Sequence, residues 1–213
     1  MMSNNGKVVP MTGMVEVDET YVGGKNRNRH KDKRKKNTKG RSLVDKTPVV
    51  GIIQREGDVH MVVVPDTERK TIHKLVNERV EKGTTLVTDS YKSYNGLVND
   101  FHHMMVKHNS VVGDYSTDRY FHTNNIEAVW NHFKRGLQGI YHNVSPKHLQ
   151  RYCDEFSFRY NTRKHDDYDR FRMTLTHVGR TRITYNDLTG RKPKPSVVIS
   201  PENVEPKKIE NSE

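Results

Sequence analysis

The order of strand-like and helix-like patterns in the first half of the chain constrains its fold more than any other feature of the sequence. Residues 14–22 alternate, are rich in β-branched side chains and stop at two glycines, which predicts a strand. Residues 48–55 and 59–64 are apolar runs that flank a Glu-Gly-Asp turn, so they predict a β-hairpin. Residues 85–88 predict a short buried strand.

A helix-like segment separates the hairpin from this later strand. Between residues 68 and 81, apolar side chains recur at steps of three and four residues, at Ile72, Leu75, Val76 and Val80. A strand, a helix and a strand in succession make part of a sheet parallel, whereas a hairpin is antiparallel, so we expect an α/β fold with a mixed sheet. We also expect a helix over residues 91–98 and one more strand over residues 103–107.

The second half of the chain predicts helices. Residues 124–140 place apolar side chains on one stripe, at Ile126, Val129, Trp130, Phe133, Leu137 and Ile140. Ser145 and Pro146 combine an N-cap residue with proline at the first helical position, and they predict a helix whose inward residues are Leu149, Tyr152, Cys153, Phe156 and Tyr160. The chain then divides into an N-terminal tail (1–13), a domain (14–165), a helical extension (166–189) and a proline-rich tail (190–213) that we expect to be disordered.

The basic character of the chain points to a polyanionic partner. The formal net charge is +11, and the segment from Lys25 to Lys46 contains eleven Lys or Arg against two Asp. This segment lacks an apolar period, so we expect a loop that contacts nucleic acid phosphates, with a loop that only aids solubility as the alternative. A single cysteine excludes an intramolecular disulfide, and the lack of a long apolar run predicts no membrane span, which together suit an intracellular protein.

Three acidic residues stand where predicted elements begin or end. Asp18 lies in the first strand, Asp89 follows the strand at 85–88, and Glu127 lies in the first turn of the long helix. If the two strands are neighbours, Asp18 and Asp89 converge and the helix can add Glu127. Carboxylates at such short separations repel one another unless protons or cations stabilise them. Magnesium is the expected cation, and two such ions can activate the attacking oxygen and stabilise the leaving oxygen of a phosphodiester displacement.

Each of these residues also has a structural explanation. Asp89 is a possible N-cap, and Asn124 with Glu127 is a possible capping box. Asp18 is harder to explain in this way, because an acid inside a strand costs desolvation unless it is exposed or liganded. Lys134 lies two helical turns after Glu127, where it either contacts substrate phosphate or is simply solvated.

Several motifs resemble those of the insertion-sequence transposases with a DDE catalytic domain. They are VDETYVGG at 17–24, TDSYKSY at 88–94, HTNNIE at 122–127 with Trp130 and Lys134-Arg135, GIYH at 139–142, and EFxxRYNxR at 155–163. The resemblance covers residues 15–163. It implies a ribonuclease-H-like mixed sheet flanked by helices, metal-dependent cleavage of double-stranded DNA at element ends, and strand transfer to target DNA by the freed 3′-hydroxyl.

The resemblance also implies roles for individual residues. Asp18, Asp89 and Glu127 would be the catalytic carboxylates that hold two Mg²⁺ ions, with Mn²⁺ as a substitute, and Lys134 would be the family's following lysine. Some relatives are described with the asparagine at the position of Asn124 as the third catalytic residue, so Asn124 and Glu127 compete for that role. We favour Glu127, because a carboxylate binds a divalent ion better than a neutral amide does.

The expected DNA contacts come from the basic segment and the long helix. The residues are Lys25, Arg27, Arg29, Lys31, Lys33, Arg34, Lys35, Lys36, Lys39, Arg41, Lys134 and Arg135. The resemblance further implies a cytoplasmic, nucleoid-associated protein that forms a homo-oligomer on DNA and does not bind membranes. Relatives usually carry an N-terminal zinc ribbon, and a sequence with one cysteine contains none, although its catalytic set is complete.

Two other functions remain open at this point. One is a non-catalytic DNA-binding protein derived from a transposase, in which the basic segment binds DNA beside an inactive site. The other is a nuclease of the same fold that cuts DNA without joining it. Retention of all three carboxylates argues against the first, and only the family motifs argue against the second.

Overall fold

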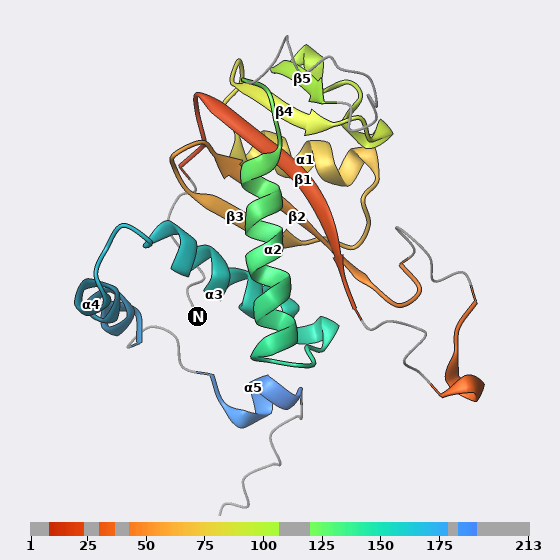
Figure 1. Ribbon diagram of the computed structural model, residues 1–213, viewed down its shortest axis with the longest axis vertical. Coiled ribbons are helices and arrows are strands. Elements are labelled where there is room, and N and C mark those ends of the chain that lie inside the picture. Colours follow the sequence, from red (N-terminus) through yellow and green to blue (C-terminus); the bar gives the residue numbers. More distant parts are fainter. Residues whose placement is uncertain (1–8, 24–29, 37–42, 107–119, 179–182, 191–213) are drawn as a thin grey trace, which may run out of the picture.

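The centre of the molecule is a five-stranded mixed sheet in the order β3-β2-β1-β4-β5 (Figure 1). The computed structural model describes residues 9–23, 30–36, 43–106, 120–178 and 183–190. Strands β1 (Met14–Val22), β2 (Thr47–Gln54) and β3 (Val59–Val63) are antiparallel, while β4 (Thr85–Asp89) and β5 (His102–Val106) run parallel to β1. The mixed sheet confirms the predicted α/β class.

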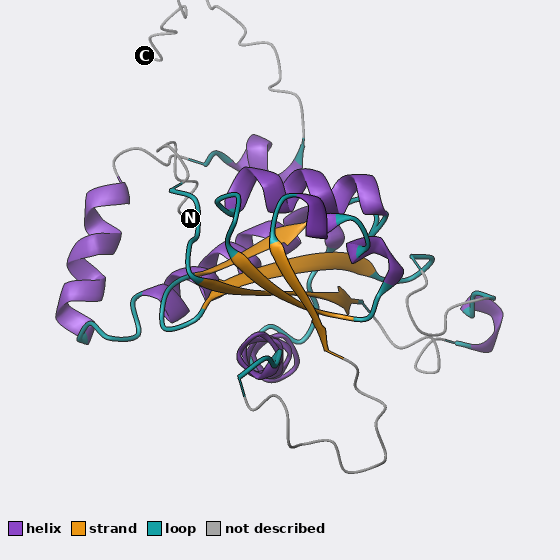
Figure 2. Ribbon diagram, turned by 90° about the horizontal axis from the view of Figure 1, so that it is seen from above, coloured by secondary structure: helices purple, strands orange, loops and turns teal. Residues whose placement is uncertain are grey.

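Helices cover both faces of the sheet, as Figure 2 shows. Because successive side chains of a strand point to opposite faces, Val15 and Val17 of β1 pack on the side of α1 (Arg69–Arg79), with Ile72 and Val76. The other face packs against α2 (Asn124–Gly139) and α3 (Leu149–Asn161). Its core contains Val49, Ile53, Ile126, Val129, Trp130, Phe133, Leu149 and Cys153. Helices α4 (Asp167–Val178) and α5 (Tyr185–Thr189) follow.

Helix α2 approaches β2 closely because Gly51 has no side chain. A Cβ added at Gly51 would lie 2.6 Å from Cζ2 of Trp130 and 2.7 Å from Cδ1 of Ile126. Real Cβ atoms do not approach other atoms so closely, so any larger residue would push the helix or the indole away. Gly51 is the register partner of Asp18 across β1 and β2, so this close approach lies beside the predicted site.

Three local predictions were wrong. Residues 91–98 form two short 3-10 turns, Lys92–Tyr94 and Leu97–Asn99, because Gly96 between them adopts a left-handed conformation with φ of 97°. Val80 leaves α1 in an extended conformation and pairs with Met11 instead. Ile140 follows the end of α2 and is exposed, so it does not join the apolar stripe.

Side-chain amides of α3 cover the outer edge of β3. Asn161 accepts from the backbone N of Val59 (2.8 Å) and donates to its carbonyl oxygen (3.1 Å). Gln150 accepts from the backbone N of Val63 (2.7 Å) and donates to the carbonyl oxygen of Met61 (3.0 Å). These bonds satisfy backbone groups that an edge strand would otherwise expose. The asparagine of the EFxxRYNxR motif, Asn161, therefore has a structural explanation.

Candidate active site

The structure brings Asp18 and Asp89 together. Strands β1 and β4 pair in parallel as far as Val17 and Thr88, so Asp18 and Asp89 are the next residues on the two strands. Both therefore stand on the face of the sheet that α2 covers. From α2, the indole Nε1 of Trp130 donates a hydrogen bond of 3.0 Å to Oδ2 of Asp18.

Asp89 also stabilises the backbone that follows it. Its Oδ1 accepts a hydrogen bond of 2.9 Å from the backbone N of Tyr91, at the start of the first 3-10 turn. Asp89 is therefore not the N-cap considered for it: the N-cap of the 3-10 turn is Tyr91, and Asp89 accepts from the backbone N of that residue. A carboxylate has two oxygens and about four acceptor sites, so this bond is compatible with metal ligation.

Glu19 is a third member of the acidic cluster, which the sequence did not indicate. Oxygens of Asp18, Glu19 and Asp89 all lie within 4.8 Å of one another, and no other such group of three occurs among the described residues. Glu19 is buried, and its Oε2 accepts a hydrogen bond of 2.7 Å from the hydroxyl of Tyr94. Strand alternation predicts that Glu19 points away from Asp18, which is why the motif alone conceals its proximity.

The acidic cluster has a high electrostatic cost. Burial raises the pKa of Asp18 to about 7, and the negative charges of Glu19 and Asp89 contribute to the shift. Burial, followed by the charge of Glu19, raises the pKa of Tyr94 well above its ordinary value, so this hydroxyl remains a hydrogen-bond donor. A bound cation would relieve the repulsion, and oxygen donors at these separations suit Mg²⁺ or Mn²⁺. The residues present therefore fit a divalent metal.

Glu127 and Asn124 lie in the first turn of α2, outside the group of three carboxylates. Oε1 of Glu127 accepts a hydrogen bond of 3.0 Å from Oγ1 of Thr123, and Asn124 is exposed. Thr123 is the residue at the N-cap, and it makes no side-chain capping bond. The capping box considered for Asn124 and Glu127 is therefore absent.

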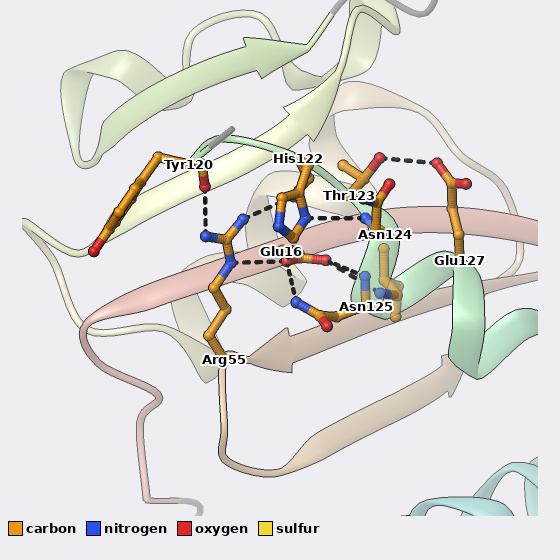
Figure 3. Close-up of polar contacts among 9 residues, drawn as sticks. Glu16, Arg55, Tyr120, His122, Thr123, Asn124, Asn125 and Glu127 are labelled. Carbon is orange, nitrogen blue, oxygen red and sulfur yellow. Dashed lines mark hydrogen bonds and ion pairs between the residues drawn. The ribbon is translucent and has the colours of Figure 1, made fainter. Parts of the chain in front are cut away.

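A buried glutamate of β1 takes the place of that cap (Figure 3). Glu16 is fully buried, and its Oε2 accepts from the backbone N of Asn125 (3.0 Å) and of Ile126 (3.1 Å). Its Oε1 accepts from Nδ2 of Asn125 (2.7 Å) and pairs with Nε of Arg55 (2.9 Å). No sequence motif singles out Glu16, although its place two residues before Asp18, on the same face of the strand, is a signal of burial.

The predicted DNA-contacting residues are only partly described. Lys134 and Arg135 are exposed on α2. The 3-10 turn Lys31–Lys33 and the residues up to Lys36 are exposed and contribute nothing to the core, whereas Lys25, Arg27, Arg29, Lys39 and Arg41 lie outside the described residues. Lys35 donates to the carbonyl oxygen of Val44 and lies 3.3 Å from Oδ1 of Asp45, so part of its charge is balanced within the chain.

Comparison with known proteins shows which family the chain resembles. Residues 10–161 match the ISXO2-like transposase domain. The chain is also 30% identical, over 104 residues, to an uncharacterized transposase-like protein of Haemophilus influenzae, an alignment that covers 48% of this chain and 80% of that protein. The five-stranded mixed sheet with its flanking helices agrees with the ribonuclease-H-like fold of such domains. Among the described residues, no helix has the length and apolar character needed to cross a membrane.

Proposed function

The chain belongs to the ISXO2-like family of DDE-type insertion-sequence transposases, and from this premise we propose that it is an active, metal-dependent polynucleotidyl transferase. It cleaves a phosphodiester bond at the ends of its element and joins the freed 3′-hydroxyl to target DNA. The observation that supports this proposal best is the acidic cluster, in which oxygens of Asp18, Glu19 and Asp89 lie within 4.8 Å of one another. A protein that only binds DNA does not need three closely spaced carboxylates, whose mutual repulsion destabilises the fold.

In this proposal, Asp18 and Asp89 hold two Mg²⁺ ions, for which Mn²⁺ can substitute, and Glu127 is the third ligand. When bound, such ions activate the attacking oxygen and stabilise the charge that develops on the leaving oxygen. Trp130 orients Asp18 through its indole N–H, and the backbone N of Tyr91 orients Asp89.

The choice of Glu127 rests on its place in α2. Glu127 lies three residues before Trp130, and side chains at this spacing are neighbours on a helix surface. Because Trp130 contacts Asp18 directly, Glu127 is on the part of α2 that adjoins the acidic cluster. Asn124 lies one turn further from Trp130 and is the rival for the third position. Glu19, held by Tyr94, adds negative charge that favours cation binding.

Lys134, Arg135 and the basic segment supply contacts to the DNA backbone. Lys134 and Arg135 are exposed on the helix that carries Glu127, and Lys31, Lys33 and Lys36 are exposed on the basic segment. Lysine and arginine at these positions neutralise phosphates without reading bases, so they position both element ends and target DNA. Bringing two element ends together favours a homo-oligomer in the DNA complex.

One assay tests the reaction. Purified protein is incubated with Mg²⁺ or Mn²⁺ and labelled DNA that carries the ends of the element encoding the chain. Nicked and joined products together are expected; nicking without joining would identify a nuclease, and binding without either would identify a non-catalytic protein. Asp18→Asn and Asp89→Asn should abolish both products and keep DNA binding, whereas Asp58→Asn, at an exposed hairpin position, should change neither.

A further inference from the structure

We infer that Glu16 is a positioning residue, which fixes the first turn of α2, and with it the third metal-site residue, relative to Asp18. This inference rests on the function proposed above. Glu16 does not belong to the acidic cluster, and the proposed reaction assigns it no part. Its contacts nevertheless join the strand that carries one metal ligand to the helix turn that carries another (Figure 3).

The N-cap residue of α2 does not cap the helix with its side chain. Nδ1 of His122 accepts from the backbone N of Asn124 (3.3 Å), and the next two N–H groups, those of Asn125 and Ile126, bind a more distant partner. The first backbone N–H groups of a helix have no partner within the helix, and an N-cap side chain usually accepts from one of them. Thr123 is at the N-cap and makes no such bond, whereas Glu16, more than a hundred residues earlier in the chain, accepts from Asn125 and Ile126. A carboxylate at this end of the helix is also favoured by the helix dipole.

Arg55 neutralises the buried charge of Glu16 and adds further bonds to the segment before α2. A fully buried carboxylate needs charged or hydrogen-bonding partners, and Arg55 of the β2–β3 turn supplies one at 2.9 Å. The guanidinium of Arg55 also donates to the carbonyl oxygens of Tyr120 and His122 (3.1 Å for His122). Residues 120–126 are therefore fixed from both β1 and the end of β2, immediately before Glu127.

The placement of Glu16 explains why a local cap would not serve equally well. A serine or aspartate at position 123 could satisfy the same amides, but it would move together with the helix. Glu16 lies two residues before Asp18, on the same face of the same strand, and it binds the two amides that directly precede Glu127. The separation between Asp18 and the first turn of α2 is thus set by one rigid strand.

Hydrogen exchange and metal binding together test this role without any measurement of activity. In Glu16→Gln, the amides of Asn125 and Ile126 should exchange about tenfold faster, because a hydrogen bond to a charged acceptor is lost. Calorimetric affinity for Mn²⁺ should fall by about 10-fold or more, as is typical when a residue that orients a metal ligand is changed. Glu127→Gln should lower the affinity too, and the Glu16→Gln/Glu127→Gln double variant should bind no worse than Glu127→Gln alone.

The controls separate positioning from general stability. Val76→Ala removes core contacts of α1 on the opposite face of the sheet, so it lowers thermal stability and should leave the affinity for Mn²⁺ unchanged. Glu81→Gln changes an exposed glutamate and should alter nothing. If Glu16→Gln does not fold, Asn125→Ala removes one bond to Glu16 and should show the same changes at about threefold.

Three results would overturn the inference in distinguishable ways. Faster exchange at Asn125 and Ile126 with unchanged affinity for Mn²⁺ would reduce Glu16 to a helix cap. Unchanged affinity in Asp18→Asn would overturn the proposed metal site itself, and the positioning role with it. A loss of affinity in Glu16→Gln that adds fully to the loss in Glu127→Gln would show that Glu16 acts elsewhere than through α2.

Discussion

The indole nitrogen of Trp130 lies 3.0 Å from Oδ2 of Asp18 and donates a hydrogen bond to it. This bond joins the middle of β1 to α2, and it is possible because Gly51, the register partner of Asp18, leaves room for the indole ring. The apolar stripe of α2 therefore does more than fill the core. One of its members orients an acidic residue of the candidate site.

Replacing Trp130 by Phe tests this orientation. The variant keeps an aromatic ring in the core and loses the N–H donor, so metal-dependent cleavage should fall by about 10-fold. Stability should fall by only about 1–2 kcal/mol, measured by urea unfolding. Leu137→Val is the matched control, since Leu137 is also buried on α2 but lies about two helical turns from Trp130. It should lose comparable stability with full activity per folded molecule; equal activity losses in both variants would contradict the orienting role.

Adding a methyl group at Gly51 should disturb the same contact from the other side. In Gly51→Ala, the new Cβ meets Trp130 and Ile126 at less than 3.0 Å, so the free energy of unfolding should fall by about 1–3 kcal/mol. Gly139→Ala is a suitable control, because no atom lies within 4 Å of a Cβ at that position of α2. That change should be neutral or slightly stabilising. Equal stability of the two variants would show that α2 can move away without cost.

Much of the fold could be predicted because it follows from side-chain period. The alternation of residues 14–22 and the stripe of α2 are local patterns, and the structure contains both elements with nearly the predicted bounds. The helix expected at residues 91–98 failed, because periodicity cannot reveal that Gly96 adopts a positive φ. The predicted end of α1 was wrong for a similar reason, since Val80 pairs with Met11, which is distant in sequence.

The candidate site was less predictable because its contacts are not local. The pairing of β1 with β4 brings Asp18 and Asp89 together, and strand order supported that expectation. Glu16 and Glu19 are close to Asp18 in the sequence, but the sequence alone does not distinguish a buried glutamate in a strand from an exposed one. The partners of Glu16 on α2 lie 109 and 110 residues away, so only the folded chain reveals them.

The raised pKa of Asp18 predicts an unusual dependence of stability on pH. The folded chain retains this proton up to pH about 7, whereas the unfolded chain releases it near pH 3.8. The metal-free protein should therefore lose stability as the pH rises between these values, by at most about 1.4 kcal/mol per pH unit from this group. Asp18→Asn should remove this component and stabilise the metal-free protein at pH 8, and Asp58→Asn should not.

Stability measured by thermal melts over this pH range also tests metal binding. In thermal melts at pH 8, Mg²⁺ should stabilise the natural protein, because the cation replaces the proton in neutralising the acidic cluster. It should stabilise Asp18→Asn much less. A pH profile of Asp18→Asn that parallels the profile of the natural protein would mean that Asp18 titrates normally.

The choice between Glu127 and Asn124 can be decided by a pair of substitutions. Glu127→Gln should lower cleavage by at least about a hundredfold, beyond the usual effect of changing a residue that only orients a ligand. Asn124→Ala should cost less than about tenfold, because a neutral amide is the weaker ligand for a divalent ion. Rates are compared under single-turnover conditions at saturating Mg²⁺. A large loss for Asn124→Ala with none for Glu127→Gln would reverse the assignment.

The basic segment predicts a salt dependence that the rest of the surface should not share. Lys31, Lys33 and Lys36 are exposed, and each phosphate that they neutralise releases condensed counterions. Replacing all three by Gln should flatten the slope of log K against log salt by up to about 2.7, at about 0.9 per contact on duplex DNA. Because such contacts do not read bases, binding to all sequences should weaken alike, as measured by fluorescence titration at several salt concentrations.

A matched variant separates contact from net charge. Lys70 and Lys74 are exposed on α1, which lies across the sheet from α2 and the acidic cluster, and Lys82 is exposed in the turn that follows α1. Replacing these three by Gln removes the same net charge, so a general electrostatic effect would weaken binding equally in both triple variants. If the basic segment contacts phosphates, the slope of log K against log salt should flatten only in the variant that lacks Lys31, Lys33 and Lys36. An unchanged slope in both would mean that the segment serves solubility.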